Sequence, residues 1–304
     1  MTQPRRGPGA ALALAVATGL LSIVNPAPLI VVPLALLFVA LPPVRPVWIV
    51  LGALITVPLW LTPETGVTDF ERGFALVLGG WFLAACVAYP SRPFLTRGLI
   101  AVVAATTTCA AFYALDPAAF AQLDSSLRLR VLDGVESLIA LGEGSSRSAL
   151  IEPTLREVAD VQMRIYPALL ALASLAGLGV AWWVFRRLTA RDGPALGPLR
   201  EFRFTDGLIW LLIVGVLLVL LAHDDVAVRA GANLIAFMGV LYSVRGLAVL
   251  VVLSGGVPGP VGIALAILAT VLLYPLVMAA TFVVGLSDTW FEFRKRRETT
   301  PPGM

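Results

Sequence analysis

The chain has 304 residues, of which 59% are hydrophobic and 13% are charged, and its formal net charge is +3 at pH 7. Soluble domains are about half apolar and about a quarter charged, so this composition argues against a soluble globule. The basic residues are spread along the chain rather than concentrated on one face, which argues against nucleic-acid binding. The two cysteines, Cys86 and Cys109, form no CxxC pattern and indicate neither a disulfide nor a metal site.

Apolar blocks in the first part of the chain predict short, closely packed helices. Arg5 and Arg6 precede the first block and another block follows at once, so we expect a retained span rather than a cleaved signal peptide. Prolines and glycines interrupt blocks shorter than the about 20 residues of an upright span, so neighbouring helices must shield their backbones. The five blocks within residues 9–115 lie near 9–24, 28–41, 47–61, 73–88 and 98–115.

Residues 116–164 form a long polar segment whose pattern predicts an amphipathic helix–loop–helix. Apolar residues recur at steps of three and four, the stretch 142–148 breaks the pattern, and a second helix is expected to begin at Pro153. We expect this insert to lie on the extracytoplasmic face of a helical bundle. Its apolar stripes are Phe120, Leu123, Leu127, Val131, Val135 and Leu138, followed by Leu155, Val158, Gln162 and Ile165.

Further apolar blocks and a basic tail complete a predicted single membrane domain. The fold expected is all-α, a polytopic transmembrane bundle of about eight or nine apolar helices. The positive-inside rule places Arg45 in the cytoplasm and the acidic loop that contains Glu71 outside. Nine crossings would carry the basic tail outside. We therefore favour eight crossings with both termini in the cytoplasm, in which the second block or the last one, interrupted by Pro275, does not cross. The domain spans residues 1–304, with blocks near 166–185, 207–222, 232–253 and 260–286 and a cytoplasmic tail at 287–304.

Aromatic and basic residues at the ends of two blocks predict anchors at the membrane interface. Tryptophan and phenylalanine suit the headgroup layer, and arginine and lysine suit a surface of anionic lipid. The expected anchors are Trp182, Trp183, Arg186, Arg187, Trp290, Phe291, Phe293, Arg294, Lys295, Arg296 and Arg297.

Arg245 is a charge deep inside an apolar block. A central arginine costs about 2.5–3.5 kcal/mol to insert, so it should face the protein interior and have a partner. In one interpretation Arg245 binds an anionic ligand or headgroup, with Tyr242 and Asn233 on a shared helical face. In the other, Arg245 caps backbone carbonyls or reaches the interface beside Tyr242 and Ser243.

Signatures of catalysis and of bound metals are absent from the sequence. His223 is the only histidine and precedes Asp224 and Asp225, so a solvated turn is expected there rather than a metal site. Asp288 shares a helical face with Glu292 near the basic tail, which favours interfacial salt bridges. Because no P-loop, HExxH or GxSxG motif occurs, we expect no enzyme activity, no catalytic residue, no metal and no cofactor.

Several stretches in the second half of the chain together match one known family. They read Tyr-Pro-Ala-Leu-Leu at 166–170, Trp-Trp-Val-Phe-Arg-Arg at 182–187, Leu-Arg-Glu-Phe-Arg-Phe-Thr-Asp at 199–206, Asn-Leu at 233–234 and Gly-Leu-Ser-Asp-Thr-Trp-Phe at 285–291. With these stretches the chain resembles the YybS-like family (DUF2232) of bacterial membrane proteins, a family of unknown function. The resemblance implies a multi-pass protein of the bacterial cytoplasmic (inner) membrane.

The first six blocks also resemble, in architecture, the substrate-binding S components of energy-coupling-factor transporters. That resemblance implies a small-molecule transport or substrate-capture protein, with a pocket under residues 116–164 and other membrane subunits, including a separate ATPase, as partners. The alternative is a non-transporting scaffold or interaction protein in envelope or division processes. The lipid bilayer is the partner common to both hypotheses, neither involves nucleic acid, and the small-molecule ligand stays unnamed.

Overall fold

A computed structural model describes most of the chain between residues 26 and 293. Within the described residues the regular elements are α-helices and two short 3-10 helices, and no strand is present, so the all-helical prediction is confirmed for them. The predicted block at 9–24 and the basic residues 294–297 lie outside this part. The described residues are 26–42, 45–61, 66–142, 148–189, 196–255, 259, 262, 268–270, 272–291 and 293.

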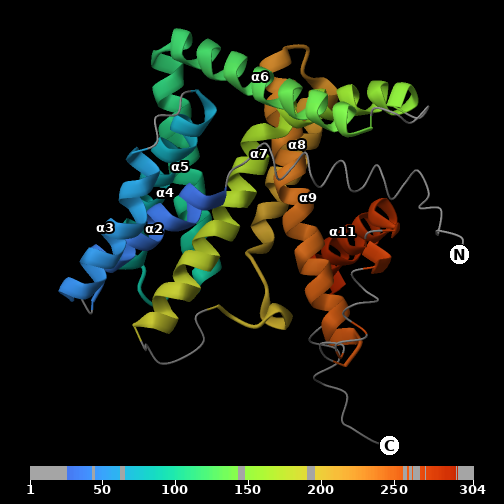
Figure 1. Cartoon of the computed structure of the whole chain (residues 1–304). Coiled ribbons are helices and arrows are strands. Elements are labelled where there is room, and N and C mark those ends of the chain that lie inside the picture. The colour runs from blue at the N-terminus through green and yellow to red at the C-terminus, as the bar shows by residue number, and fades with distance from the viewer. Residues whose placement is uncertain are drawn as a thin grey trace, which may run out of the picture. The chain divides into compact units, whose positions relative to one another are not determined.

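The chain divides into two compact units, which we treat separately (Figure 1). One comprises residues 19–197 and is called here the α2–α7 unit. The other comprises residues 198–304 together with 1–18, and is called the α8–α11 unit. The single domain expected from the sequence stays a prediction.

The helices of the α2–α7 unit follow the predicted apolar blocks. Three of them begin at proline, which is tolerated in a first turn because its missing N–H would have no partner there. The helices are α2 (Pro26–Ala40), α3 (Pro46–Leu61), α4 (Val67–Ala88), α5 (Phe94–Leu115), α6 (Pro117–Gly142) and α7 (Ser148–Leu188).

Helix α2 lies at the centre of this unit and packs against α3, α4 and α7. Leu29 and Leu37 of α2 are fully buried, and the Phe38 ring lies 5.8 Å from that of Phe185 on α7. Helix α3 instead exposes apolar side chains such as Val50 and Leu54, at 65% and 68%. Such a surface suits contact with lipid, where apolar side chains lose nothing by exposure.

The predicted helix–loop–helix is present as α6 and the first part of α7. The two helices contact each other, and Leu127, Val131 and Leu155 from the predicted stripes are buried. Phe120 is 47% exposed, and its ring centroid lies 6.0 Å from that of Tyr113 on α5. We call this segment the α6–α7 hairpin.

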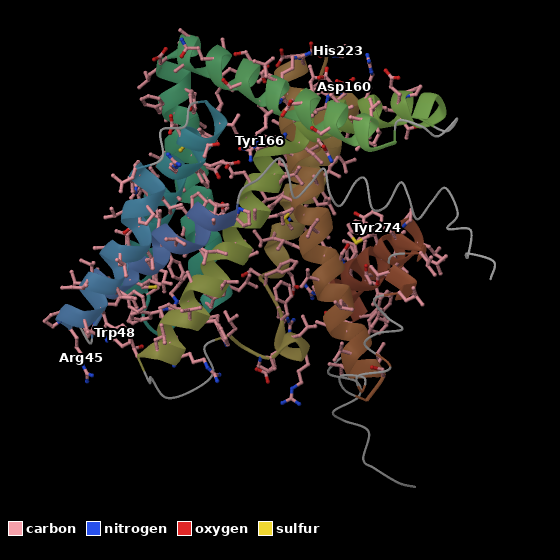
Figure 2. All side chains as sticks on the ribbon, in the orientation of Figure 1. Arg45, Trp48, Asp160, Tyr166, His223 and Tyr274 are labelled. Atoms are coloured by element: carbon pink, nitrogen blue, oxygen red, sulfur yellow. The ribbon has the colours of Figure 1, made fainter. Side chains whose placement is uncertain are left out.

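The hairpin lies at one end of the α2–α7 unit (Figure 1). Asp160 of the hairpin is labelled at that end, while Arg45, just before α3, lies at the opposite end (Figure 2). The positive-inside rule likewise predicts that Arg45 and the hairpin lie on opposite sides of the membrane.

The beginning of α4 corrects a prediction. The sequence predicts a loop around Glu71 and an apolar block from residue 73, whereas α4 begins at Val67 and Glu71 is fully buried. A hydropathy pattern ends a block at its first charges, but charges remain inside a helix where packing supplies partners. Similarly, α7 begins at Ser148, ahead of the predicted start at Pro153.

The α8–α11 unit centres on α9 (Asp225–Leu253), which packs against α8 (Ile209–Leu221) and α11 (Tyr274–Phe291). Asp224 caps α9, because its carboxylate accepts a hydrogen bond of 3.0 Å from a backbone N–H of the first turn. Pro275 lies in the first turn of α11, so the interruption predicted there is the beginning of a helix. Two 3-10 helices, Leu199–Glu201 and Asp206–Leu208, precede α8.

Several described helices are apolar enough for a lipid environment. Four have the length and composition to cross a membrane: α4, α5, residues 152–188 of α7, and α9. Helices α2 and α3 and residues 206–221 are apolar but shorter. These helices support a multi-pass membrane protein, and the number of crossings stays a prediction.

Candidate functional site

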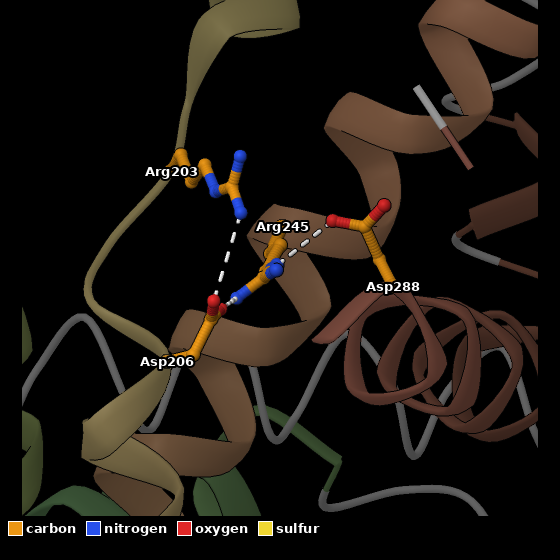
Figure 3. A network of polar contacts seen from close by, with 4 residues as sticks. All are labelled: Arg203, Asp206, Arg245 and Asp288. Carbon is orange, nitrogen blue, oxygen red and sulfur yellow. Dashed lines mark hydrogen bonds and ion pairs between the residues drawn. The ribbon is translucent and has the colours of Figure 1, made fainter. Parts of the chain in front are cut away.

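Arg245 on α9 is fully buried and joins two carboxylates (Figure 3). Its Nε donates a hydrogen bond to Asp288 Oδ2 at 3.0 Å, and its Nη1 donates one to Asp206 Oδ1 at 2.8 Å. The Asp288 side chain, on α11, is 3% exposed, whereas that of Asp206 is 44% exposed. A buried guanidinium is tolerated only with charged partners, and here acidic side chains rather than backbone carbonyls supply them.

Asp206 also bridges to a second arginine. Its Oδ2 lies 3.6 Å from Nη2 of Arg203, whose side chain is 45% exposed. The charges therefore alternate along the series Arg203, Asp206, Arg245 and Asp288, and they cancel (Figure 3). Arg245 and Asp288 are removed from solvent, while Arg203 and Asp206 remain accessible.

An aromatic ring lies next to the buried guanidinium. The Cζ atom of Arg245 lies 5.4 Å from the centroid of the Phe204 ring, within range of a cation–π interaction. The Phe204 ring in turn lies 5.2 Å from that of Tyr242, which is fully buried. Arg245 Nη2 is buried and has no hydrogen-bond partner among the described residues.

Close contact between α9 and α11 brings these groups together. A Cβ placed on Gly246 would meet the backbone of Thr281, and one placed on Gly285 would meet the backbone of Tyr242. Glycine permits this approach because it presents only backbone to the neighbouring helix. Since Arg245 adjoins Gly246 in the chain, the same contact brings its guanidinium to α11.

Asn233 does not join this cluster. Its side-chain amide donates a hydrogen bond of 2.8 Å to the carbonyl of Arg229, one turn earlier. At a rise of about 1.5 Å per residue, Asn233 lies about 18 Å from Arg245 along α9. Of the three residues predicted to bind a ligand, Arg245 and Tyr242 both lie next to the Phe204 ring, whereas Asn233 lies away from it.

A second buried charge lies in the α2–α7 unit. Glu71 Oε1 accepts hydrogen bonds of 3.2 Å from Arg130 Nη1 and of 3.2 Å from the Tyr166 hydroxyl. Arg130 comes from α6, and Tyr166, labelled in Figure 2, comes from α7, so one carboxylate on α4 connects three helices. Gln162, one turn before Tyr166, is also buried, and its Nε2 has no hydrogen-bond partner in the described part of the chain.

A cavity of about 620 Å³ opens beside this second cluster, between α4 and α6. Arg130 lies in its wall, with Glu71 directly behind. Asp133 and Glu136 are exposed, line the cavity, and make no ion pair among the described residues. The remaining lining residues are Val67, Thr68, Ser126, Leu129 and Leu132.

The predicted anchors of α7 occupy different environments. Trp182 is 3% exposed and lies between the guanidinium groups of Arg97 and Arg186, at 4.7 and 5.8 Å from its ring. Trp183 is 46% exposed, with Arg187 5.6 Å from its ring. Trp182 therefore packs inside the bundle, and Trp183 faces outward.

The predicted anchors at the end of α11 lie partly within the described residues. Trp290 and Phe291 are 64% and 52% exposed, and Phe293 stacks on Phe291 with ring centroids 5.6 Å apart. The basic anchors, residues 294–297, lie outside the described residues.

Comparison with family models decides the membership of this chain. A family described as predicted membrane protein, DUF2232, matches residues 11–289. The chain belongs to the DUF2232 family. Both charge clusters of this DUF2232 protein fall within the match, and residues 294–297 fall beyond it. Comparison with the curated proteins and with the solved structures gives no match.

Sequence reasoning on this DUF2232 protein did not identify Glu71. A signal was present, because Glu71 lies three, four and seven residues before Phe74, Ala75 and Leu78, and these positions share one helical face. That face is the buried one. Among the described residues, no three His, Cys, Asp or Glu side chains gather as metal ligands would.

Proposed function

We propose that this membrane protein captures a small cationic molecule in the cavity between α4 and α6, in a transport or substrate-binding role similar to that of S components. The cavity is the observation that carries the proposal. Its volume of about 620 Å³ lies within the range of small-molecule sites, about 300–1,000 Å³. Helix α6 of the α6–α7 hairpin forms one of its walls.

The charges around the cavity favour a cation. Arg130 is compensated by its bond to Glu71. Asp133 and Glu136 are three residues apart on α6, so they share a face and add their negative potential. Hydroxyls of Thr68 and Ser126 and apolar side chains of Val67, Leu129 and Leu132 would contact the rest of the ligand.

In this proposal the hairpin faces the extracytoplasmic side, and both termini lie in the cytoplasm. The opposite placement of Arg45 and the hairpin supports that orientation (Figure 2). Cysteines introduced as Asp160→Cys and Arg45→Cys test it in intact cells with a membrane-impermeant maleimide, in a background with Cys86 and Cys109 replaced by serine. Labelling of the Asp160→Cys variant alone is expected, and labelling of the Arg45→Cys variant alone would reverse the orientation.

The ligand is tested by mass spectrometry of small molecules that co-purify with the full chain in detergent, followed by calorimetric titration with putrescine, spermidine and choline. We expect a bound organic cation whose affinity falls at least about fivefold in Asp133→Asn/Glu136→Gln. Glu157→Gln is the matched control, because it removes an exposed carboxylate of α7 outside the cavity lining.

Two results would contradict this function. Equal affinity in the double variant and in Glu157→Gln would show that the ligand does not bind in this cavity. Recovery of envelope or division proteins with no bound small molecule would favour the scaffold hypothesis instead.

A further inference from the structure

We infer that the cluster of Arg203, Asp206, Arg245 and Asp288 is a binding site for a phosphate-bearing anion, and that Asp206 holds the position the phosphate would take. This site lies in the α8–α11 unit and does not depend on the cavity between α4 and α6. Its argument starts from the hydrogen-bonding capacity of Arg245.

Arg245 has a donor that its carboxylate partners do not use. Nε and Nη1 donate to Asp288 and Asp206, and Nη2 is buried with no hydrogen-bond partner in the described part of the chain. A guanidinium binds phosphate or carboxylate best through two parallel N–H···O bonds. Asp206 accepts a hydrogen bond from Nη1 only. An anion that bonded to both Nη1 and Nη2 would use the donor that Asp206 leaves unused.

Asp206 is the group in the cluster that can leave this position. Its side chain is 44% exposed, compared with 3% for Asp288 and none for Arg245. When Asp206 turns to solvent, the two arginines and Asp288 leave a single positive charge, which a phosphodiester would neutralise.

Exposed tryptophans indicate the depth of the cluster in the membrane. Trp210 follows Asp206 by one helical turn and is 66% exposed, and Trp290 follows Asp288 by two residues and is 64% exposed. Tryptophan concentrates at the membrane–water interface, where lipid phosphates also lie. An anionic phospholipid headgroup is therefore the favoured source of the phosphate, and a soluble phosphate ester has the same chemistry.

The test measures binding to the full chain purified in a neutral detergent. Native mass spectrometry compares dioleoylphosphatidylglycerol with dioleoylphosphatidylcholine, and inorganic phosphate is assayed by stabilisation against heat. Asp206→Asn should bind phosphatidylglycerol about tenfold more tightly, because a neutral amide competes weakly for Arg245. Arg203→Gln should bind about fivefold more weakly.

Arg200→Gln is the matched control, since Arg200 is exposed, lies three residues before Arg203 and pairs with Glu201 at 3.8 Å. The inference is overturned if neither lipid nor inorganic phosphate binds, or if the two lipids bind equally and inorganic phosphate does not. It is also overturned if Asp206→Asn and Arg203→Gln behave as Arg200→Gln does. A purely structural cluster would lose heat stability in Asp206→Asn with no gain in binding. If inorganic phosphate alone binds, with the same order of variants, the phosphate site stands and its ligand is soluble.

Discussion

Replacing Gly246 with alanine is expected to separate α9 from α11. The added Cβ would stand against the carbonyl oxygen of Thr281, and it would lie 2.7 Å from the Thr281 carbonyl carbon and 2.9 Å from the Gly285 nitrogen. Ordinary Cβ contacts fall between 3.4 and 4 Å. Because these neighbours are backbone atoms, side-chain rotation cannot relieve the overlap, and the helices must move apart by roughly 1 Å.

This separation destabilises the protein in two ways. Overpacking of a close contact costs about 1–3 kcal/mol. Moving the helices also stretches the 3.0 Å hydrogen bond between Arg245 Nε and Asp288 Oδ2, and a hydrogen bond to a charged group contributes about 1.5–3 kcal/mol. We therefore expect Gly246→Ala to lower the free energy of unfolding by about 3–5 kcal/mol.

Gly239→Ala is the control on the same helix. A Cβ at Gly239 meets no described atom within 4 Å, so alanine should stabilise α9 by about 0.5–1 kcal/mol. Unfolding would be followed by circular dichroism and tryptophan fluorescence as detergent micelles are titrated with sodium dodecyl sulfate. Equal unfolding midpoints for the two variants would refute the packing argument.

The same titration checks three further variants. Arg245→Met should cost about 3–5 kcal/mol because it removes the guanidinium that bonds to the buried Asp288 carboxylate, and adding Asp288→Leu should restore most of the loss; no recovery in the double variant would contradict this. Glu71→Gln should cost about 1–3 kcal/mol, because the partly buried Arg130 loses its charged partner. Tyr166→Phe removes one hydrogen bond and should cost about 1 kcal/mol. A larger loss than in Glu71→Gln would mean that the tyrosine hydroxyl, rather than the ion pair with Arg130, contributes most of the stability of the cluster.

Apolar blocks located the helices because a membrane helix is apolar on both its lipid-facing and its packed faces. The periodicity that buries Leu127 and Val131 likewise predicted the α6–α7 hairpin. Hydropathy alone could not show that Glu71 turns inward, because an inward charge and a loop charge interrupt an apolar block in the same way. What separates them is periodicity, which places Glu71 on the face of Phe74 and Leu78.

The candidate site was predictable only in part. Arg245 was conspicuous as a charge within an apolar block, and its burial follows from the cost of placing a charge in lipid. Its partners were not predicted, because Asp206 and Asp288 are separated from it by 39 and 43 residues. The approach of Asp288 depends on the packing of α9 against α11 through Gly246 and Gly285, which no local pattern encodes.

If the cavity binds a ligand as proposed, the bond between Arg130 and Glu71 affects which charge that ligand can carry. Arg130 belongs both to the cavity wall and to a buried carboxylate, so a ligand that attracts it outward must weaken its bond to Glu71. An anion entering the cavity would do so, and it would leave negative charge in a region of low dielectric constant. A cation leaves the bond intact and gains from Asp133 and Glu136. In the proposed capture function, the bond between Arg130 and Glu71 would therefore disfavour anionic ligands before any shape-specific contact forms.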